Sequence, residues 1–394
     1  MWSRERISVC AYFAILGIVC SAWASSIDEI KVLLGLDKRQ LGWLLFSGPF
    51  GNLISFTFAS AFVARFGARR SVILVSFAYL ASAAALTACF FTAAPIPFWC
   101  AAIALFGGSG NVLNISINAQ AGLVEKHAGR QIMGSFHGVF SLMMFFGAIF
   151  TLTTTSLAIP VALRLLVTVL AAVLLHLAFL RGLPADEPSD CPADTASKRW
   201  HRPDRALVAM GFAALVIMGC EASICDWVCV FFRDSLSATD AHAKWGFCAV
   251  TGMMAYARFK GDRLVNRFTA SRVLHMDCFL VSLGLLLALA TPFLPVKGLA
   301  ALIVATAGYA ISGFGIAGMI PILYSKVNRT KAMPPASALT FVGSMGFFGY
   351  FFGPPLIGYV AESFNLSIAL GLFAVFILSC LALNPDRRQD ASTR

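Results

Sequence analysis

The chain has 394 residues, of which 59% are hydrophobic and only 12% charged, and its formal net charge is +11. With a mean hydropathy of +0.80, it carries more apolar surface than a soluble domain of this length can bury, which excludes a soluble protein. The apolar runs are long and unbroken, as in residues 71–93 and 159–180, which excludes the short alternating strands of a membrane β-barrel.

Windows of about 20 apolar residues, the length that crosses a bilayer core, recur along the whole chain. The first follows Arg4 and Arg6 and ends near Ala22-Trp23-Ala24, a pattern that also resembles a cleaved signal peptide. Cleavage would leave eleven spans and unpair two related halves, so we expect an uncleaved first helix. The twelve predicted spans are residues 7–27, 41–63, 71–93, 97–123, 132–154, 159–180, 206–229, 243–259, 272–293, 299–324, 335–360 and 366–383.

The segments between these spans differ in charge. Every second segment, beginning with the N-terminus, is basic, and together these segments hold 23 of the 30 Lys and Arg residues. Basic residues are retained on the cytoplasmic side of a membrane, so the bias predicts that both termini are cytoplasmic. We therefore expect a multi-pass protein of a bacterial inner membrane.

One long polar and Pro-rich segment, residues 181–205, separates the sixth span from the seventh. It is too short and too poor in apolar residues to fold alone, and its composition is typical of a cytoplasmic linker. The prediction is an N-terminal six-helix bundle over residues 1–183, a linker over 184–205, and a C-terminal six-helix bundle over 206–394.

Two short basic loops occupy equivalent positions in the two halves. Residues 64–70 read ARFGARR after the second span, and residues 266–272 read NRFTASR after the eighth. Their guanidinium groups can pair with helix C-terminal carbonyls or with acids on neighbouring helices. A basic loop repeated at the same place in each half indicates duplication.

The loops resemble the signature loop of the major facilitator superfamily, Gly-x-x-x-Asp-Arg-x-Gly-Arg-Arg. Arg65, Gly67, Arg69 and Arg70 match it in the first copy, and Arg267 matches its first arginine in the second. The chain departs from the pattern at the Gly and Asp positions, which hold Ser60 and Ala64 in the first copy and Asp262 and Asn266 in the second. The resemblance implies the all-α major facilitator fold of twelve transmembrane helices in two pseudo-symmetric six-helix bundles.

Further residues narrow the resemblance to the YbjJ-type group of bacterial inner-membrane facilitators. They run through nearly the whole chain and include unusual polar residues inside the spans. The resemblance implies a transporter, and many relatives carry an acid where this chain has Asn114. The matching residues are Trp23, Ala24, Phe106, Gly107, Asn118, Glu125, His137, Gly138, Ser141, Glu221, Asp226, Trp227, Arg258, Gly353, Pro354 and Pro355.

Acidic residues inside the seventh span are candidates for ion coupling, because a charge at the bilayer centre is costly unless it is paired or hydrated. Glu221 lies close to mid-span, where desolvation favours the protonated acid, and Asp226 with Trp227 lies nearer the outer end. Either acid can instead hold helices together. We predict ion coupling at Glu221, with Asp226 second.

Three amides lie on one face of the fourth span. Asn111, Asn114 and Asn118 are spaced i, i+3 and i+7. Amides donate and accept hydrogen bonds, as recognition of a polar solute requires, although they also join membrane helices. We predict that they line a substrate cavity, with Trp23 and Trp227 as further substrate-binding residues.

Other residues are candidates for gating or packing. His137, near the cytoplasmic end of the fifth span, lies at a depth similar to that of Asn118, and a hydrogen bond between them is expected. Arg164 is expected to extend to the lipid headgroups. Small and helix-bending residues permit close, bent helices suited to alternating access. The gating or structural set is His137, Arg65, Gly67, Arg69, Arg70, Arg258, Arg267, Gly353, Pro354 and Pro355.

The function predicted from these features is movement of a small polar solute, a sugar or organic metabolite, by a monomer coupled to protons or Na⁺. Efflux of amphipathic drugs is the alternative, and a non-transporting receptor or scaffold is another. The 11 Cys form no CxxC pair, and neither a Walker A loop nor a nucleophile–base pair is readable. We expect no enzyme activity, cofactor, metal or nucleic-acid partner.

Overall fold

A computed structural model describes residues 3–129, 132–186, 203–328, 330 and 333–380 of the chain. Over these residues the secondary structure is entirely helical, with fourteen α-helices and three short 3-10 turns. The all-α prediction is therefore confirmed.

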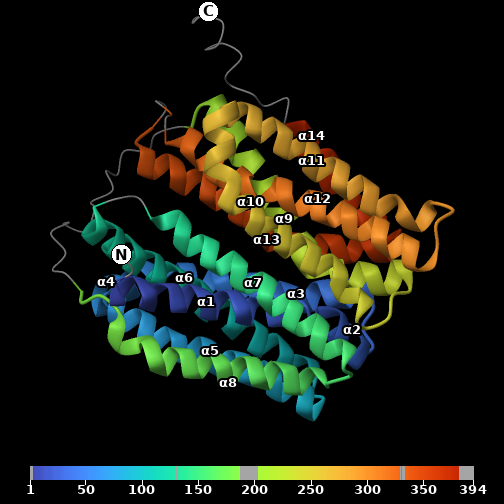
Figure 1. Cartoon of the computed structure of the whole chain (residues 1–394), viewed down its shortest axis with the longest axis horizontal. Coiled ribbons are helices and arrows are strands. Elements are labelled where there is room, and N and C mark those ends of the chain that lie inside the picture. Colours follow the sequence, from blue (N-terminus) through green and yellow to red (C-terminus); the bar gives the residue numbers. More distant parts are fainter. Residues whose placement is uncertain (1–2, 130–131, 187–202, 329, 331–332, 381–394) are drawn as a thin grey trace, which may run out of the picture.

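Helices α1 to α8 form one bundle, which we call the N bundle, and α9 to α14 form the second, the C bundle (Figure 1). The N bundle comprises α1 Arg4–Ala24, α2 Ile27–Leu34, α3 Lys38–Phe56, α4 Ala59–Phe66, α5 Ala68–Thr92, α6 Ile96–Ala128, α7 Met133–Ser156 and α8 Val161–Phe179, with η1 Leu180–Gly182. The C bundle comprises α9 Arg205–Leu236, η2 His242–Lys244, α10 Trp245–Phe268, α11 Ala270–Ala290, η3 Thr291–Phe293, α12 Gly298–Val327, α13 Pro335–Ser363 and α14 Leu366–Ser379.

The helices match the predicted spans closely. In the described part of the chain, eight are long and apolar enough to cross a membrane by length and composition, and nine if α3 and α4 count as one. Helices α10, α13 and α14 follow at the positions of the eighth, eleventh and twelfth predicted spans. With α2 and α4 taken as short additions, the fold has the twelve helices that the sequence predicts.

The second predicted span, residues 41–63, is not one straight helix. Helix α3 ends at Phe56, and α4 continues after Thr57 and Phe58 at an angle of 51°. The Thr57 hydroxyl donates to the carbonyl of Ile54 at 2.6 Å, which offers that carbonyl an alternative to the next helical turn. A local hydropathy window cannot detect such a bend.

Side-chain caps fix several helix starts. Asp37 accepts from the Gln40 amide at 2.6 Å, and the Gln40 side chain accepts from the Asp37 amide at 3.0 Å, which closes a capping box before α3. Asp204 accepts from the Leu207 amide at 2.8 Å and caps α9. Each cap satisfies backbone donors that the first helical turn leaves without partners.

The two bundles meet along α3 against α13 and along α7 against α10. Gly42 permits the first contact, because a Cβ at that position would lie 2.6 Å from the carbonyl oxygen of Pro354 and 3.1 Å from Cα of Gly358. Gly252 on α10 faces the ring of Phe145 on α7 in the same way. Small residues therefore allow close approach between bundles as well as within them.

The repeated basic loops have the same backbone conformation. Gly67, between α4 and α5, has φ 80° and ψ 157°, and Thr269, between α10 and α11, has φ 73° and ψ 150°. In each loop the arginine stacks on the next residue, with Arg65 5.6 Å from the Phe66 ring centre and Arg267 5.2 Å from that of Phe268. This agreement supports the duplication inferred from sequence.

Candidate functional site

Helix α2 and helix α4 lie at opposite ends of the molecule, which we call the α2 end and the α4 end (Figure 1). The position of a residue along its helix then shows how far it lies from each end. Glu221 is near the middle of α9, which runs from the α4 end to the α2 end, and Arg258 is near the middle of α10. The polar residues of interest fall into a group midway between the ends and a group at the α2 end.

The midway group centres on Arg258. Its guanidinium donates to the Ser141 hydroxyl on α7 of the N bundle and lies 3.3 Å from Oε1 of Glu221 on α9. Ser141 in turn donates to the backbone carbonyl of His137 at 3.0 Å. The side chains of Arg258 and Glu221 are 23% and 30% exposed, so the pair is partly accessible. Neither this ion pair nor the bridge between the bundles was predicted from the sequence.

The three amides of α6 have separate partners. Asn111 donates to the Ser55 hydroxyl on α3 at 2.8 Å, so this amide joins two helices of the N bundle. Asn118 donates to the side-chain oxygen of Asn114, one turn earlier, at 3.0 Å. Asn114 itself is exposed. Of the three, Asn114 therefore has the side chain most available to a solute.

Two aromatic residues of the N bundle pack against Phe106, which lies on the same helix as the amides. Trp23 on α1 packs against Phe106 with ring centres 6.0 Å apart, and Tyr79 on α5 stacks on the same ring at 4.9 Å. The Tyr79 hydroxyl is 3.3 Å from the Cys20 thiol. Trp23 is half-buried, and it remains a candidate substrate contact.

Trp227, which the sequence predicts to bind substrate, is fully buried. Helix α9 continues to Leu236, and Trp227 has 0% exposure. Its indole N–H has no acceptor among the described residues. The adjacent Asp226 is half-buried. Its carboxylate forms neither an ion pair nor a hydrogen bond within the part of the chain that the structure describes.

At the α2 end, oppositely charged residues of the two bundles meet in a buried cluster. Asp28 on α2 accepts from Lys244 of η2 at 2.5 Å and from Nε of Arg233 on α9 at 3.0 Å. The side chains of Asp28 and Lys244 are both 0% exposed. Lys244 also lies 3.3 Å from Glu29, which pairs with Arg164 of α8. We call these five residues the α2 cluster.

The electrostatics of the α2 cluster favour the ionised state. The Lys244 ammonium lies 2.5 Å from Asp28 and 3.3 Å from Glu29, and these two carboxylates offset the cost of burying its charge. A buried pair of this kind adds little net stability over an apolar contact, whereas removal of one partner leaves an uncompensated charge. Removal of one member therefore leaves a buried charge without its partner at the contact between the bundles.

Less buried pairs surround the cluster. Lys31 is 2.9 Å from Asp234, with side chains 17% and 19% exposed. The backbone amide of Lys38 donates to Glu362 on α13 at 3.1 Å, which adds a further link between the bundles. The sequence did contain a signal for these pairs. Acidic residues follow the first predicted span, and basic residues lie near the outer ends of the seventh and eighth.

Two predictions about single residues are wrong. Arg164 does not extend to the headgroups, because it is 3% exposed and paired with Glu29. His137 is exposed, its ring packs against Phe13 at 5.3 Å, and among the described hydrogen bonds none joins it to Asn118. Both outcomes depend on how the helices rotate against one another, which the sequence pattern does not specify.

The first basic loop is held by an acid from outside the loop. The amide of Arg69 donates to the Asp186 carboxylate at 2.8 Å, and a Cβ at Gly67 would clash with that carboxylate. Arg69 also reaches the carbonyl of Arg181 at 3.5 Å. Asp186 thus supplies an acid to a loop that has Ala64 where the family signature has Asp.

Gly353, Pro354 and Pro355, predicted as gating or structural residues, lie in the C-terminal half of α13. Gly353 and Pro354 are buried, and a Cβ at Gly353 would lie 3.2 Å from the Ser223 hydroxyl of α9. Pro354 faces Gly42 across the contact between bundles.

Within the described residues, no group of three or more His, Cys, Asp or Glu could hold a metal ion.

The comparison that decides the family covers most of the chain. Residues 7–333 match the model of the Major Facilitator Superfamily. The chain belongs to this superfamily. It is a multi-pass membrane transporter of the major facilitator type, and the twelve helices described above are the superfamily fold.

Two bacterial relatives span nearly the same length. An uncharacterized MFS-type transporter of Yersinia pestis is 28% identical over 382 residues, which cover 96% of this chain and 94% of the relative. Membrane protein MosC of Rhizobium meliloti is 28% identical over 386 residues, which cover 97% and 90% of the two chains.

Several solved major facilitator structures have the same fold. A mutant of the nucleoside transporter NupG superposes with a TM-score of 0.76 at 12% identity, covering 96% of this chain and 99% of that one. A D-xylose–proton symporter superposes with a TM-score of 0.71 at 13% identity over 96% of each chain. FucP in its outward conformation gives 0.63 at 15% identity, over 96% and 97%. At these identities the likeness concerns the fold alone.

Proposed function

We propose that this major facilitator protein moves a small polar solute, a sugar or an organic metabolite, across a bacterial inner membrane by alternating access coupled to protons. The observation that carries the proposal is the Glu221–Arg258 pair, which lies midway along the helices and reaches Ser141 of the other bundle. A carboxylate in such a position can bind a proton in one state and its arginine in the other. The protein is proposed to act as a monomer.

The proposed orientation places the α4 end and both termini in the cytoplasm and the α2 end outside, as the basic segments predict. In that orientation the α2 cluster closes the outer end, because its charges are buried between the bundles. The linker proposed over residues 184–205 falls mostly outside the described residues. It would join two bundles that rock against each other about the midway group.

Coupling would follow from the geometry of the midway group. While Glu221 is ionised, Arg258 is held by it at 3.3 Å and also bonds Ser141 across the bundles. Protonation of Glu221 removes the charge that holds Arg258 on its own bundle. The freed guanidinium can then bind hydroxyl or carboxylate groups of a solute near Asn114. Two proteins of the same fold, a nucleoside transporter and a D-xylose–proton symporter, support a polar solute and proton coupling.

The test uses the purified protein in proteoliposomes with an imposed pH gradient. A labelled monosaccharide and a labelled nucleoside are the first solutes, and a thermal-shift screen of metabolites extends the set. Glu221→Gln keeps the shape and fixes the neutral state, so gradient-driven accumulation should be lost while solute exchange at equal concentration persists. Glu221→Asp should retain partial accumulation with a shifted pH optimum.

The matched control is Glu5→Gln, which neutralises an acid that is 40% exposed and pairs with His127. It should accumulate solute like the parent protein. Accumulation by Glu221→Gln at the parental level from acidic to neutral pH would exclude Glu221 as the coupling site and make Asp226 the next candidate. Transport of amphipathic drugs in place of polar solutes would instead favour efflux.

A further inference from the structure

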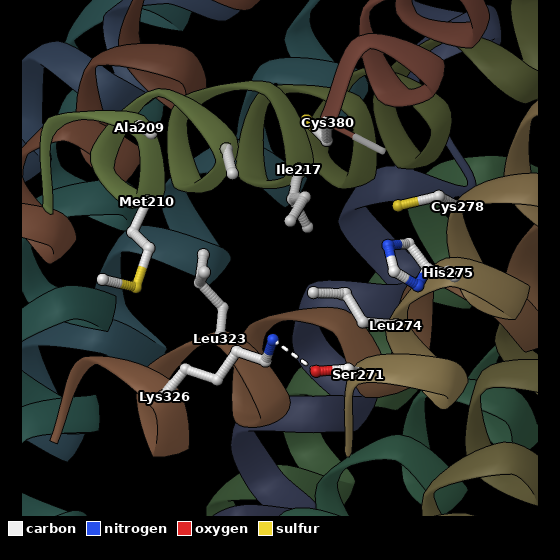
Figure 2. A pocket seen from close by; sticks show the side chains of 11 residues that line it. Ala209, Met210, Ile217, Ser271, Leu274, His275, Cys278, Leu323, Lys326 and Cys380 are labelled. Atoms are coloured by element: carbon white, nitrogen blue, oxygen red, sulfur yellow. Dashed lines mark hydrogen bonds between the residues drawn. The ribbon is translucent and has the colours of Figure 1, made fainter. Parts of the chain in front are cut away.

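A small pocket lies in the C bundle, away from the midway group. Its walls come from the first turns of α9 and α11, the last turns of α12, and Cys380 just after α14 (Figure 2). All of these helix ends lie at the α4 end. Transport as proposed above assigns no role to this pocket.

The polar side chains of the pocket gather on one side. Lys326, in the last turn of α12, donates to the Ser271 hydroxyl at the start of α11 at 2.7 Å. His275, one turn after Ser271, also lines the pocket, and Figure 2 shows Leu274 between its ring and the Lys326–Ser271 pair. An ammonium, a hydroxyl and an imidazole together are suited to the oxygens of a phosphate group.

The remaining lining is apolar. Eight of the eleven lining residues are Ala, Met, Ile, Leu or Cys. On α9 they extend from Ala209 to Ile217, about 12 Å of helix, and Leu274 and Leu323 face them from α11 and α12. A free inorganic anion gains nothing from such a wall, whereas an acyl chain does, at about 25 cal/mol per Å² of buried apolar surface.

We propose that this pocket binds an anionic phospholipid, with its phosphate at Lys326, Ser271 and His275 and an acyl chain along the apolar wall of α9. Arg205 and Arg272, both exposed, lie in the first turns of α9 and α11 and add positive charge at the same end. Basic pockets between transmembrane helices on the cytoplasmic side attract anionic headgroups. The inference depends on the proposed orientation in one respect, which is that the lipid comes from the cytoplasmic leaflet. It does not depend on the transported solute or on its coupling.

Native mass spectrometry of the full-length protein in detergent, titrated with phosphatidylglycerol or phosphatidylethanolamine of equal chain length, tests the proposal. The parent should bind phosphatidylglycerol more tightly. Lys326→Gln should lower its apparent affinity about fivefold, the loss expected for one basic residue near the headgroup. Arg272→Gln, the matched control, removes a neighbouring charge that does not line the pocket and should have the smaller effect.

Two further arms separate the lipid from other ligands. Ala213→Phe should fill the apolar part and weaken phosphatidylglycerol binding while Lys326 stays in place. Inorganic phosphate alone should leave the melting temperature unchanged. The proposal is overturned if Lys326→Gln binds phosphatidylglycerol like the parent, if phosphatidylethanolamine binds equally well, or if inorganic phosphate stabilises the protein as strongly as the lipid. Since Lys326 is only half-buried, its variant should fold and decide the question even if Ala213→Phe does not.

Discussion

The N bundle and the C bundle contribute different charges to the contacts between them. At the α2 end the N bundle supplies the buried carboxylate of Asp28, and the C bundle supplies Lys244 and Arg233. Midway along the helices the C bundle supplies both members of the Glu221–Arg258 pair, and the N bundle supplies only the neutral hydroxyl of Ser141.

The contact at the α2 end is therefore suited to closing the molecule, whereas the midway contact can exchange partners. The buried charges of Asp28 and Lys244 at the α2 end are paired with residues of the opposite bundle, so separation there leaves both without partners. Midway, the charges are neutralised within one bundle, and separation costs a single hydrogen bond to a hydroxyl. We therefore expect substitutions at the α2 end to change stability and conformation, and substitutions midway to change transport.

Asp28→Asn should have the largest effect on stability. It leaves Lys244, which is 0% exposed, without its nearest carboxylate, and loss of one partner of a buried pair costs about 3–5 kcal/mol. Thermal unfolding in detergent measures the change. Asp234→Asn is the control, because its partly exposed pair with Lys31 is worth at most about 1 kcal/mol. Equal losses in the two variants would contradict a special role for the buried cluster.

Arg258→Gln should mainly affect transport. The partly exposed Glu221 can take up water or a proton when its partner is removed, so the stability loss should stay near about 1 kcal/mol. Solute accumulation should fall at least about tenfold, because both the ion pair and the bridge to Ser141 are lost. Combined with Glu221→Gln, the substitution should restore stability without restoring coupling. A variant that unfolds like Asp28→Asn would remove the distinction between the two regions.

Asn114 should be more accessible than Asn111. In a background without native cysteines, Asn114→Cys should react readily with a hydrophilic thiol reagent, and a transported solute should protect it. Asn111→Cys should react more slowly and lose about 1 kcal/mol, because the Asn111 amide is bonded to Ser55 inside the N bundle. Lack of reaction at both positions from either side would assign the amides to helix packing.

The smallest effect concerns the repeated loops. Thr269 holds φ 73° and ψ 150°, a conformation that is nearly exclusive to glycine, and the equivalent residue of the N bundle is Gly67. Thr269→Gly should therefore raise the free energy of unfolding by about 1 kcal/mol, partly offset by the greater chain entropy of glycine. Gly67→Ala should lower it, since a Cβ there meets the Asp186 carboxylate. A destabilised Thr269→Gly protein would show that the Thr side chain has a packing role.

The sequence predicted the fold well and the site only in part. Span positions, the repeated loops and the mid-helix place of Glu221 follow from residues close together in the chain. The partners did not follow: Arg258 for Glu221, Asp28 for Lys244 and Ser55 for Asn111 come from other helices. An acid inside α11, Asp277, was also missed, although it is 4% exposed and one of its oxygens has no hydrogen-bond partner among the described residues.

By itself the sequence determined which segments are helices long enough to cross a membrane, because a spanning helix satisfies its backbone hydrogen bonds internally and needs only a local run of apolar residues. Only the tertiary structure decided which charges meet and which are buried. Asp28 and Lys244 are 216 residues apart in the chain, and their contact depends on how α2 and η2 are placed by the packing of two bundles. Arg164 and Trp227 are buried for the same reason: helix rotation, set by packing between neighbours, selects the face that each side chain presents.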